Sequence, residues 1–432
     1  MNLELWRESF GAKITFSCLL MGNVSPITCE LPLEWEHVEK TTGSVLPGRE
    51  GHGGVFVDGK IFFFGGIQDC AEDPSSMDED EEPFPTMCMN DLYSFDVATR
   101  DWQKVECGGS APSPRSGFVF AAVAPNQLFV YGGLDPLYGW MTDGFLLDTS
   151  TLQWTRIEFT GDCPSPRDKM ASVMLPDGQL AMFGGFGPQV VEAVDGEEET
   201  ATFGWFNDAF FLDFKKNRWS RLDCQGELPT PRAATGLALI TRPKQVKLEK
   251  KEATTEGHPV PPPQYTEEGD AQHYLYIMGG RDNRGGRTND CFSLELSSLT
   301  WEKQQVRGTA PVGRSFHTVV SVGDKLVVFG GADPSHHLLN DLHLLDTRAD
   351  SQHAWVQPTF CETARMPRAR AFHATTMEAS VEGNCLLYIH GGTNEMDLES
   401  GEHLTFSDDL WRINLRMSSP SPLCINAYSL IE

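Results

Sequence analysis

Short apolar runs that end in a Gly-Gly pair recur six times along the 432 residues of this chain. Their aliphatic and aromatic residues are typical of buried strands. The six runs with their glycines are Ile61–Gly66, Leu128–Gly133, Leu180–Gly185, Leu275–Gly280, Leu326–Gly331 and Leu387–Gly392. A polar turn, often Asn-Asp, follows the glycines and leads into an alternating strand, as in NDLHLLD at Asn340.

A tryptophan-bearing strand then completes each of the first five repeats, at Trp102, Trp154, Trp219, Trp301 and Trp355. Short strands repeating about every fifty residues predict an all-β propeller. The sixth repeat lacks this strand after Asp408–Leu415, whereas LEWEHVE (Leu33–Glu39) precedes the first repeat. We therefore predict six blades, with the N-terminal strand completing the last blade and closing the ring, which removes two exposed sheet edges.

These repeats resemble those of the kelch family, in which each repeat is one four-stranded blade. The resemblance implies a six-bladed kelch β-propeller over residues 31–416. An N-terminal extension (residues 1–30) and a short tail (residues 417–432) flank it. A polar, proline-rich insertion at about residues 241–272 is expected to be disordered, since it cannot bury much apolar surface.

Charge and cysteine content narrow the possible functions. The formal net charge is -27, which disfavours general binding to nucleic acid or an anionic membrane. The 11 cysteines include no CxxC pair, which favours reduced thiols in the cytoplasm or nucleus and gives no sign of a metal or other cofactor. The acidic run Cys70–Glu82 is interpreted as a solvated loop, and its role stays open.

An arginine in a Pro-x-x-Arg-like element opens each repeat. For Arg49, Arg115, Arg167, Arg232 and Arg370 we favour a structural role, in which the arginine pairs with an acid and shapes the turn. The loops after the Gly-Gly pairs start on the same face of the propeller. That face therefore gathers the arginines, the variable loops, and His52, His317 and His373.

The loop GGRDNRGGRTND (Gly279–Asp290) and the segment PVGRSFH (Pro311–His317) are more specific. They resemble the group of kelch domain-containing protein 2, receptors of cullin-RING ubiquitin ligases that capture C-terminal degrons ending in glycine. In that group two arginines and a serine hold the terminal carboxylate. The matching residues are Arg281, Arg287 (with Arg284 as the alternative) and Ser315. A guanidinium suits this task because its planar fork donates two parallel hydrogen bonds to a carboxylate.

The same resemblance implies the pocket wall and the partners. Wall residues would be Lys169, Phe186, Trp205 and Phe316, the last in place of a tryptophan. The partners would be protein C-termini, with elongin B/C and a cullin for the ligase. In the tail, Leu423, Cys424 and Ala427 match an elongin-binding segment, whereas Pro420 and Pro422 would disturb its start. Whether the tail docks elongin stays open.

Two other classes of function remain. A kelch scaffold could bind an internal peptide or a folded partner on the same face, without any ligase role. An enzyme is disfavoured, because a copper oxidase would need a tyrosine beside the histidines, and no GxSxG, P-loop or HExxH motif occurs. We expect a protein-binding propeller in the cytoplasm, the nucleus or both.

Overall fold

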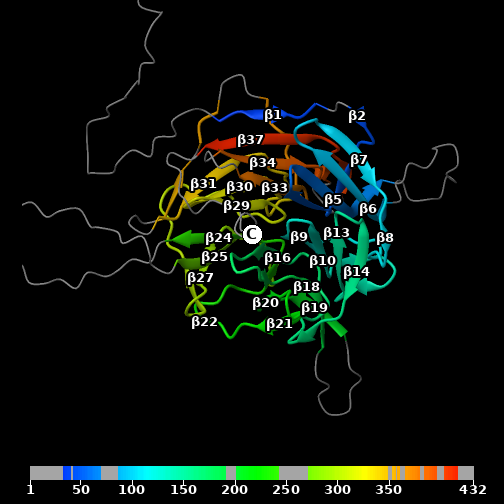
Figure 1. Cartoon of the computed structure of the whole chain (residues 1–432). Coiled ribbons are helices and arrows are strands. Elements are labelled where there is room, and N and C mark those ends of the chain that lie inside the picture. Colours follow the sequence, from blue (N-terminus) through cyan, green and yellow to red (C-terminus); the bar gives the residue numbers. More distant parts are fainter. Residues whose placement is uncertain are drawn as a thin grey trace, which may run out of the picture.

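A computed structural model describes residues 33–39, 42–69, 86–190, 201–242, 271–348, 353–356, 358–360, 365–379, 384–396 and 403–416. Every regular element within these ranges is a β-strand. Accordingly, the described chain holds no helix long and apolar enough to cross a membrane. The described strands form six large sheets of four to six strands arranged around an axis, together with four two-stranded sheets. Their colours follow the sequence around the ring (Figure 1).

The first three sheets are built in the same order from the axis outward. Blade 1 contains β4 (Gly53–Val57), β5 (Lys60–Asp69), β6 (Thr86–Asp96), β7 (Asp101–Val105) and β2 (Thr42–Gly43), with β3 (Arg49–Glu50) also on β5. Blade 2 contains β9 (Val119–Ala124), β10 (Gln127–Tyr131), β13 (Gly144–Asp148), β14 (Gln153–Ile157) and β8 (Gly108–Gly109). Blade 3 contains β16 (Ala171–Met174), β17 (Leu180–Phe183), β20 (Ala209–Asp213), β21 (Arg218–Arg221) and β15 (Thr160–Gly161).

The other three sheets repeat this plan. Blade 4 contains β24 (Gly236–Arg242), β25 (Gln272–Met278), β27 (Cys291–Glu295), β28 (Thr300–Lys303) and β22 (Gln225–Gly226). Blade 5 contains β29 (Thr318–Val322), β30 (Lys325–Phe329), β31 (Leu342–Asp346) and β32 (Ala354–Val356). Blade 6 contains β33 (Ala374–Ala379), β34 (Asn384–His390), β37 (Leu410–Arg416) and β1 (Trp35–His37).

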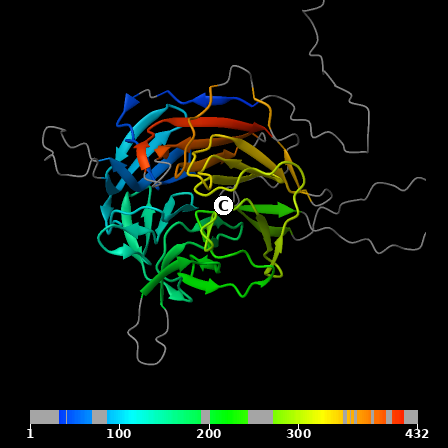
Figure 2. The same cartoon turned by 180° about the vertical axis from the view of Figure 1, so that it is seen from behind.

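The closure of the ring by an N-terminal strand is confirmed. Strand β1 pairs antiparallel with β37, with Trp35 opposite Ile413. In Figure 1 the blue β1 lies along the outer side of the red β37, and Figure 2 shows the same neighbours from behind. Trp35 is buried at the contact between blades 5 and 6, in the position that the other repeats fill with their own tryptophans.

The core consists of six apolar clusters, one at each contact between neighbouring blades. The cluster between blades 1 and 2, for example, packs Phe64 and Leu92 of one blade against Leu128, Phe145 and Trp154 of the next. Aliphatic and aromatic side chains on both faces of each sheet are thus buried, which explains the nearly continuous apolar strands of the sequence. The sequence analysis correctly predicted the all-β, six-bladed fold.

A closed ring of backbone hydrogen bonds surrounds the axis. The arginine of each Pro-x-x-Arg-like element is called the repeat arginine from here on. The ring joins the residue two positions after each repeat arginine to its equivalent in the neighbouring blade, with N···O distances of 2.7–3.2 Å. The six residues are Gly51, Gly117, Lys169, Ala234, Phe316 and Phe372, all with positive φ. The ring fixes the relative positions of the loops that carry the candidate site.

Three parts of the predicted domain organisation lie outside the described residues. They are the extension at residues 1–30, most of the insertion, at residues 243–270, and the tail at residues 417–432. The acidic run also falls outside them, from Cys70 onward.

Candidate functional site

The repeat arginines form six ion pairs in which the arginine is buried, which supports their structural interpretation. The pairs are Arg49–Asp91, Arg115–Asp143, Arg167–Asp208, Arg232–Asp290, Arg314–Asp341 and Arg370–Asp409, with closest N···O distances of 2.5–2.7 Å. Each arginine also donates to the carbonyl of the first glycine in its Gly-Gly pair. The aspartate usually comes from the Asn-Asp turn of the sequence pattern.

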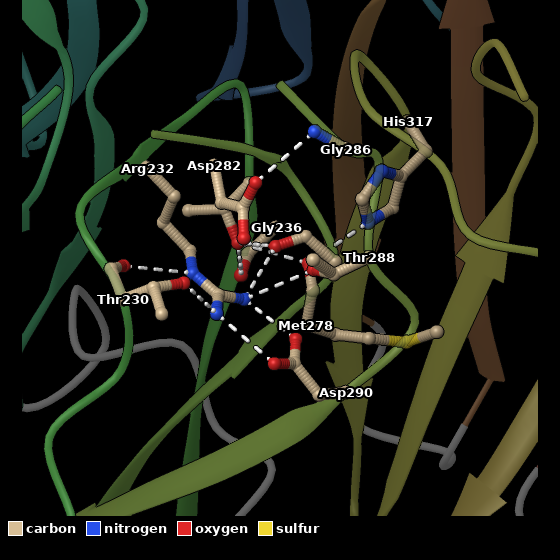
Figure 3. A network of polar contacts seen from close by, with 11 residues as sticks. Thr230, Arg232, Gly236, Met278, Asp282, Gly286, Thr288, Asp290 and His317 are labelled. Atoms are coloured by element: carbon tan, nitrogen blue, oxygen red, sulfur yellow. Dashed lines mark hydrogen bonds and ion pairs between the residues drawn. The ribbon is translucent and has the colours of Figure 1, made fainter. Parts of the chain in front are cut away.

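Figure 3 shows the pair in blade 4. Arg232 donates to both carboxylate oxygens of Asp290, at 2.6 and 3.0 Å, and to the Gly279 carbonyl. Beside it, the Asp282 carboxylate accepts the backbone amides of Arg284 and Gly286. Asp290 is thus paired with Arg232, and Asp282 accepts hydrogen bonds from the loop backbone.

The three predicted carboxylate-binding residues lie together. The backbone of Arg281 forms an isolated bridge with that of Arg287. Arg287 Nε donates to Ser315 Oγ at 2.8 Å, and its Nη1 donates to the Asp333 carbonyl oxygen. Ser315 is fully buried, held by backbone hydrogen bonds to Ala332 in blade 5. Arg287, and not the alternative Arg284, therefore lies beside the serine.

The charge at this point is unbalanced. Within the described residues, no acidic side chain forms an ion pair with the guanidinium of Arg281 or Arg287. Burial, together with the positive charge of Arg281, lowers the pKa of Arg287 below its ordinary value, while Asp333 acts in the opposite direction. Two guanidinium groups held close together, one of them half-buried, form a site that an anion would stabilise.

The predicted wall residues of blade 3 form a second group. Phe186 and Trp205 face each other across the hairpin of β18 (Phe186–Val190) and β19 (Ala201–Trp205), with ring centroids 5.0 Å apart. Lys169 Nζ lies 2.5 Å from the Asp168 carboxylate, which also accepts Trp140 Nε1 at 3.1 Å. Lys169 is thus partly neutralised by a buried acid, in contrast to Arg281 and Arg287.

Phe316, the remaining wall residue, stacks on Phe372 with ring centroids 3.5 Å apart. Both phenylalanines adopt left-handed backbone conformations, with φ of 59° and 58°. Bulky residues rarely adopt this conformation. The axial ring connects the two groups, because the Phe316 amide donates to the Ala234 carbonyl and the Ala234 amide to that of Lys169.

Comparison with known proteins places this architecture in a family. The KLHDC2/KLHL20/DRC7 Kelch-repeats domain matches residues 31–247 and 244–427. The chain belongs to the kelch-repeat family. This kelch propeller is 29% identical over 314 residues to Kelch domain-containing protein 3 of Bos taurus, covering 69% of this chain and 67% of the relative. It is 27% identical over 312 residues to Kelch domain-containing protein 2 of Bos taurus, covering 69% and 66%.

A more distant relative covers more of the kelch propeller. Host cell factor 1 of Homo sapiens is 25% identical over 408 residues, which is 89% of this chain but only 17% of that protein. The chain spans about two thirds of the length of the kelch domain-containing relatives. The comparisons therefore establish the propeller, whose kelch relatives indicate a protein-binding role.

Three residues at the kelch propeller's site were missed from the sequence. Phe372 occupies the same repeat position in PRARAFH as Phe316 in PVGRSFH, so aligning the repeats could have identified it. Trp140 follows the second Gly-Gly pair in a loop that carried no family signal. The Asp333 carbonyl gives no sequence signal, because any residue supplies a backbone oxygen.

Proposed function

We propose that this kelch propeller binds the C-terminal carboxylate of other proteins, with Arg281, Arg287 and Ser315 as the binding residues. The observation that carries the proposal is a contrast among arginines. Each of the six repeat arginines has an aspartate partner, whereas Arg281 and Arg287 have no acidic partner among the described residues. A ligand carboxylate would supply Arg281 and Arg287 with the acidic partner that an aspartate supplies to each repeat arginine.

The geometry suits a terminal carboxylate better than an internal acidic side chain. Ser315 is buried, and Arg287 is directed toward blade 5 by its bonds to Ser315 and Asp333. An anion that contacts Arg287 beside the buried Ser315 lies close to the protein backbone. A chain end with glycine as its last residue brings the carboxylate there without a side chain to accommodate, which supports the preference for a Gly end.

Binding measurements with matched peptides test this proposal. A peptide ending in Gly-Gly with a free carboxylate should bind at least about tenfold more tightly than its C-terminal amide, because each charge-assisted hydrogen bond is worth about 1.5–3 kcal/mol. Arg281→Ala and Arg287→Ala should each weaken binding by a similar factor. Arg287→Lys should recover only part of it, because lysine keeps the charge and loses the fork.

Arg284→Ala is the matched control, since it removes a positive charge from the same exposed loop without touching Ser315. Its affinity for the free-carboxylate peptide should stay close to that of the unchanged protein. Equal binding of the acid and the amide would refute carboxylate capture. The propeller would then be a scaffold for an internal peptide or a folded partner.

The finer part of the proposal is that the chain serves as the substrate-recognition subunit of a cullin-RING ubiquitin ligase. The support is the resemblance of the Arg281–Arg287 loop and of Leu423, Cys424 and Ala427 to the corresponding segments of that group. Purified elongin B/C should bind the chain, and deletion of residues 417–432 should abolish that binding while peptide affinity stays unchanged. Failure of the full chain to retain elongin B/C would leave the adaptor interpretation.

A further inference from the structure

Exposed large apolar side chains gather at one end of the propeller. Those of the described chain are Met87, Leu137, Tyr138, Phe203, Leu228 and Val312. Four follow a Gly-Gly pair and two precede a repeat arginine, so all belong to loops on the face that carries Arg281 and Arg287. Single exposed apolar residues such as Leu228 are ordinary, whereas adjacent ones that extend into a larger apolar surface indicate contact with a partner.

The two most exposed of these side chains are neighbours at a rigid tip. Leu137 is 83% exposed and Tyr138 is 74% exposed, between β11 (Leu134–Asp135) and β12 (Gly139–Trp140) in blade 2. The buried carboxylate of Asp135 accepts both of their backbone amides, at 2.8 and 3.2 Å. The turn is therefore held in place, and little ordering is required when a partner contacts it.

A row of aromatic rings leads from this tip toward the candidate site. Trp140, at the end of β12, lies 5.0 Å from Phe203 and 6.0 Å from Phe186, measured between ring centroids. Phe186 in turn lies 5.0 Å from Trp205, and Trp140 is fixed by its hydrogen bond to Asp168. Both hairpins, β11–β12 and β18–β19, thus contribute to one apolar surface.

The backbone connects this surface with the proposed carboxylate site on the neighbouring blade. Lys169 follows Asp168 directly, and its carbonyl accepts the amide of Ala234 in the axial ring. The preceding residue, Ala233, pairs with Arg281 through β23 (Arg232–Ala233) and β26 (Arg281–Asp282). The aromatic row therefore begins one blade away from the arginine pair and continues outward over blade 3 to blade 2.

We propose that Leu137, Tyr138, Trp140 and Phe203 bind the segment of the substrate that precedes its terminal glycine, through apolar side chains in that segment. The inference rests on the proposed function, because a chain whose end lies at Arg281 and Arg287 has to leave the site across the same face. The substrate class is accordingly a C-terminal tail with aliphatic or aromatic residues upstream of its end. A membrane suits the surface less well, since the net charge of -27 repels anionic headgroups.

Three free-carboxylate peptides ending in Gly-Gly test the inference. One is a tetrapeptide; the other two have about twelve residues, enough to span roughly 40 Å when extended. The apolar-tail peptide has leucine and phenylalanine in its first half, and the serine-tail peptide has serine there. The apolar-tail peptide should bind about tenfold more tightly than the other two, as expected when aromatic anchors are buried.

The double variant Leu137→Ser, Tyr138→Ser should remove this advantage and leave the affinity for the tetrapeptide unchanged. Leu228→Ser is the control, because it removes an exposed apolar side chain (45% exposed) from a different loop of the same face. It should leave all three affinities unchanged. Arg287→Ala, in contrast, should weaken all three peptides.

The outcomes separate the two proposals. If the tetrapeptide binds but the double variant does not weaken the apolar-tail peptide, the docking surface is wrong and carboxylate capture stands. If the apolar-tail peptide binds through Leu137 and Tyr138 and its amide binds equally well, carboxylate capture is wrong and the docking surface stands. If the double variant only disrupts a dimer of the free protein, the tip is an interface between two copies, which overturns the inference.

Discussion

Arginine occurs in two distinct environments in this propeller, which differ in whether an acidic side chain pairs with the guanidinium. Arg115 is fully buried and donates to both oxygens of Asp143 and to the Gly132 carbonyl. Arg287 is half-buried and donates to an uncharged hydroxyl and a carbonyl oxygen. Among the described residues the first guanidinium is therefore ion-paired and the second is not, although both arginines lie at the same end of the propeller.

The buried pairs should therefore be essential for stability and dispensable for the chemistry of binding. Arg115→Ala leaves Asp143 and the Gly132 carbonyl without their partner. Removing one member of a buried ion pair costs about 3–5 kcal/mol, so the urea concentration at the midpoint of unfolding should fall markedly. Urea denaturation monitored by tryptophan fluorescence measures this midpoint. Arg115→Lys should recover part of the loss, because it restores the charge without the fork.

Arg284→Ala serves as the reference for this comparison, since substitution of an exposed residue changes stability by about 0.5 kcal/mol or less. A denaturation midpoint for Arg115→Ala equal to that of Arg284→Ala would show that the buried pair does not hold the blade together. Peptide binding should be retained by the Arg115→Lys variant below its unfolding transition, because blade 2 lies away from Ser315 and the arginine pair.

At the scale of strands, the elements that could be predicted from the sequence are those that recur in every repeat. The Gly-Gly runs and the tryptophan strands identified the blades, because apolar residues on both faces of a sheet leave a strong pattern. Closure by Trp35 could be inferred from the one strand missing after Leu415 and the one in excess at Leu33. Both inferences depend on counting repeats rather than on the propensity of any single segment.

The short connecting strands could not be predicted in the same way. Strand β15, for example, has only two residues and pairs parallel with β21 of blade 3. Gly161 adopts φ of 82° there, and a Cβ on it would lie 2.2 Å from the Trp219 carbonyl oxygen. A single glycine with no apolar pattern around it gives little signal in the sequence. That position 161 requires a glycine becomes clear only from its close approach to the Trp219 backbone in the folded structure.

The candidate site was predicted only in part, because some of its features also depend on tertiary contacts that leave no pattern in the sequence. Family resemblance indicated Arg281, Arg287 and Ser315, and their contact emerges from the pairing of two loops that are 28 residues apart at Arg287 and Ser315. The hairpin tip at Leu137 and Tyr138 was not predicted. The solvent exposure of a loop side chain depends on whether other parts of the folded chain cover it. The sequence therefore does not distinguish a buried loop leucine from an exposed one.

At the scale of the whole molecule, the contacts between neighbouring blades hold the propeller together, and several histidines are buried in these contacts. His52 of blade 1 lies 3.1 Å from His390 of blade 6, measured between Nε2 and Nδ1. His317 of blade 5 forms a hydrogen bond from Nε2 to the Met278 carbonyl of blade 4, at 3.1 Å. All three histidines are at most 8% exposed, so a charged imidazolium would be poorly solvated at these contacts.

Burial accordingly lowers the pKa of these groups. The pKa values of His317 and His390 fall to about 3, and that of His52 lies well below its usual range. Nearby arginines add to the effect, Arg314 at His317 and Arg49 at His52 and His390, whereas Asp341 and Asp409 oppose it. The folded propeller therefore keeps all three histidines neutral from neutral pH down to mildly acidic pH.

The propeller should consequently lose stability as the pH falls below about 6.5, the usual pKa of an unfolded histidine. Between pH 6.5 and about 4.5 the unfolded chain takes up protons that the folded chain does not, and each histidine then costs roughly 1 kcal/mol per pH unit. Above pH 7 these groups contribute no slope, because they are neutral in both states. Urea denaturation at a series of pH values measures the effect.

Two variants identify the histidines as its source. His317→Gln can keep a hydrogen bond to the Met278 carbonyl without a titrating ring, so the loss of stability between pH 6.5 and 4.5 should become shallower by about one proton. His337→Gln makes the same substitution at a largely exposed ring beside Asp333, and it serves as the control for replacing a histidine without changing a buried contact. A denaturation midpoint independent of pH between 7.5 and 5 would mean that the folded state accommodates the charged histidines. The blade contacts would then be more open to water than the buried imidazoles indicate.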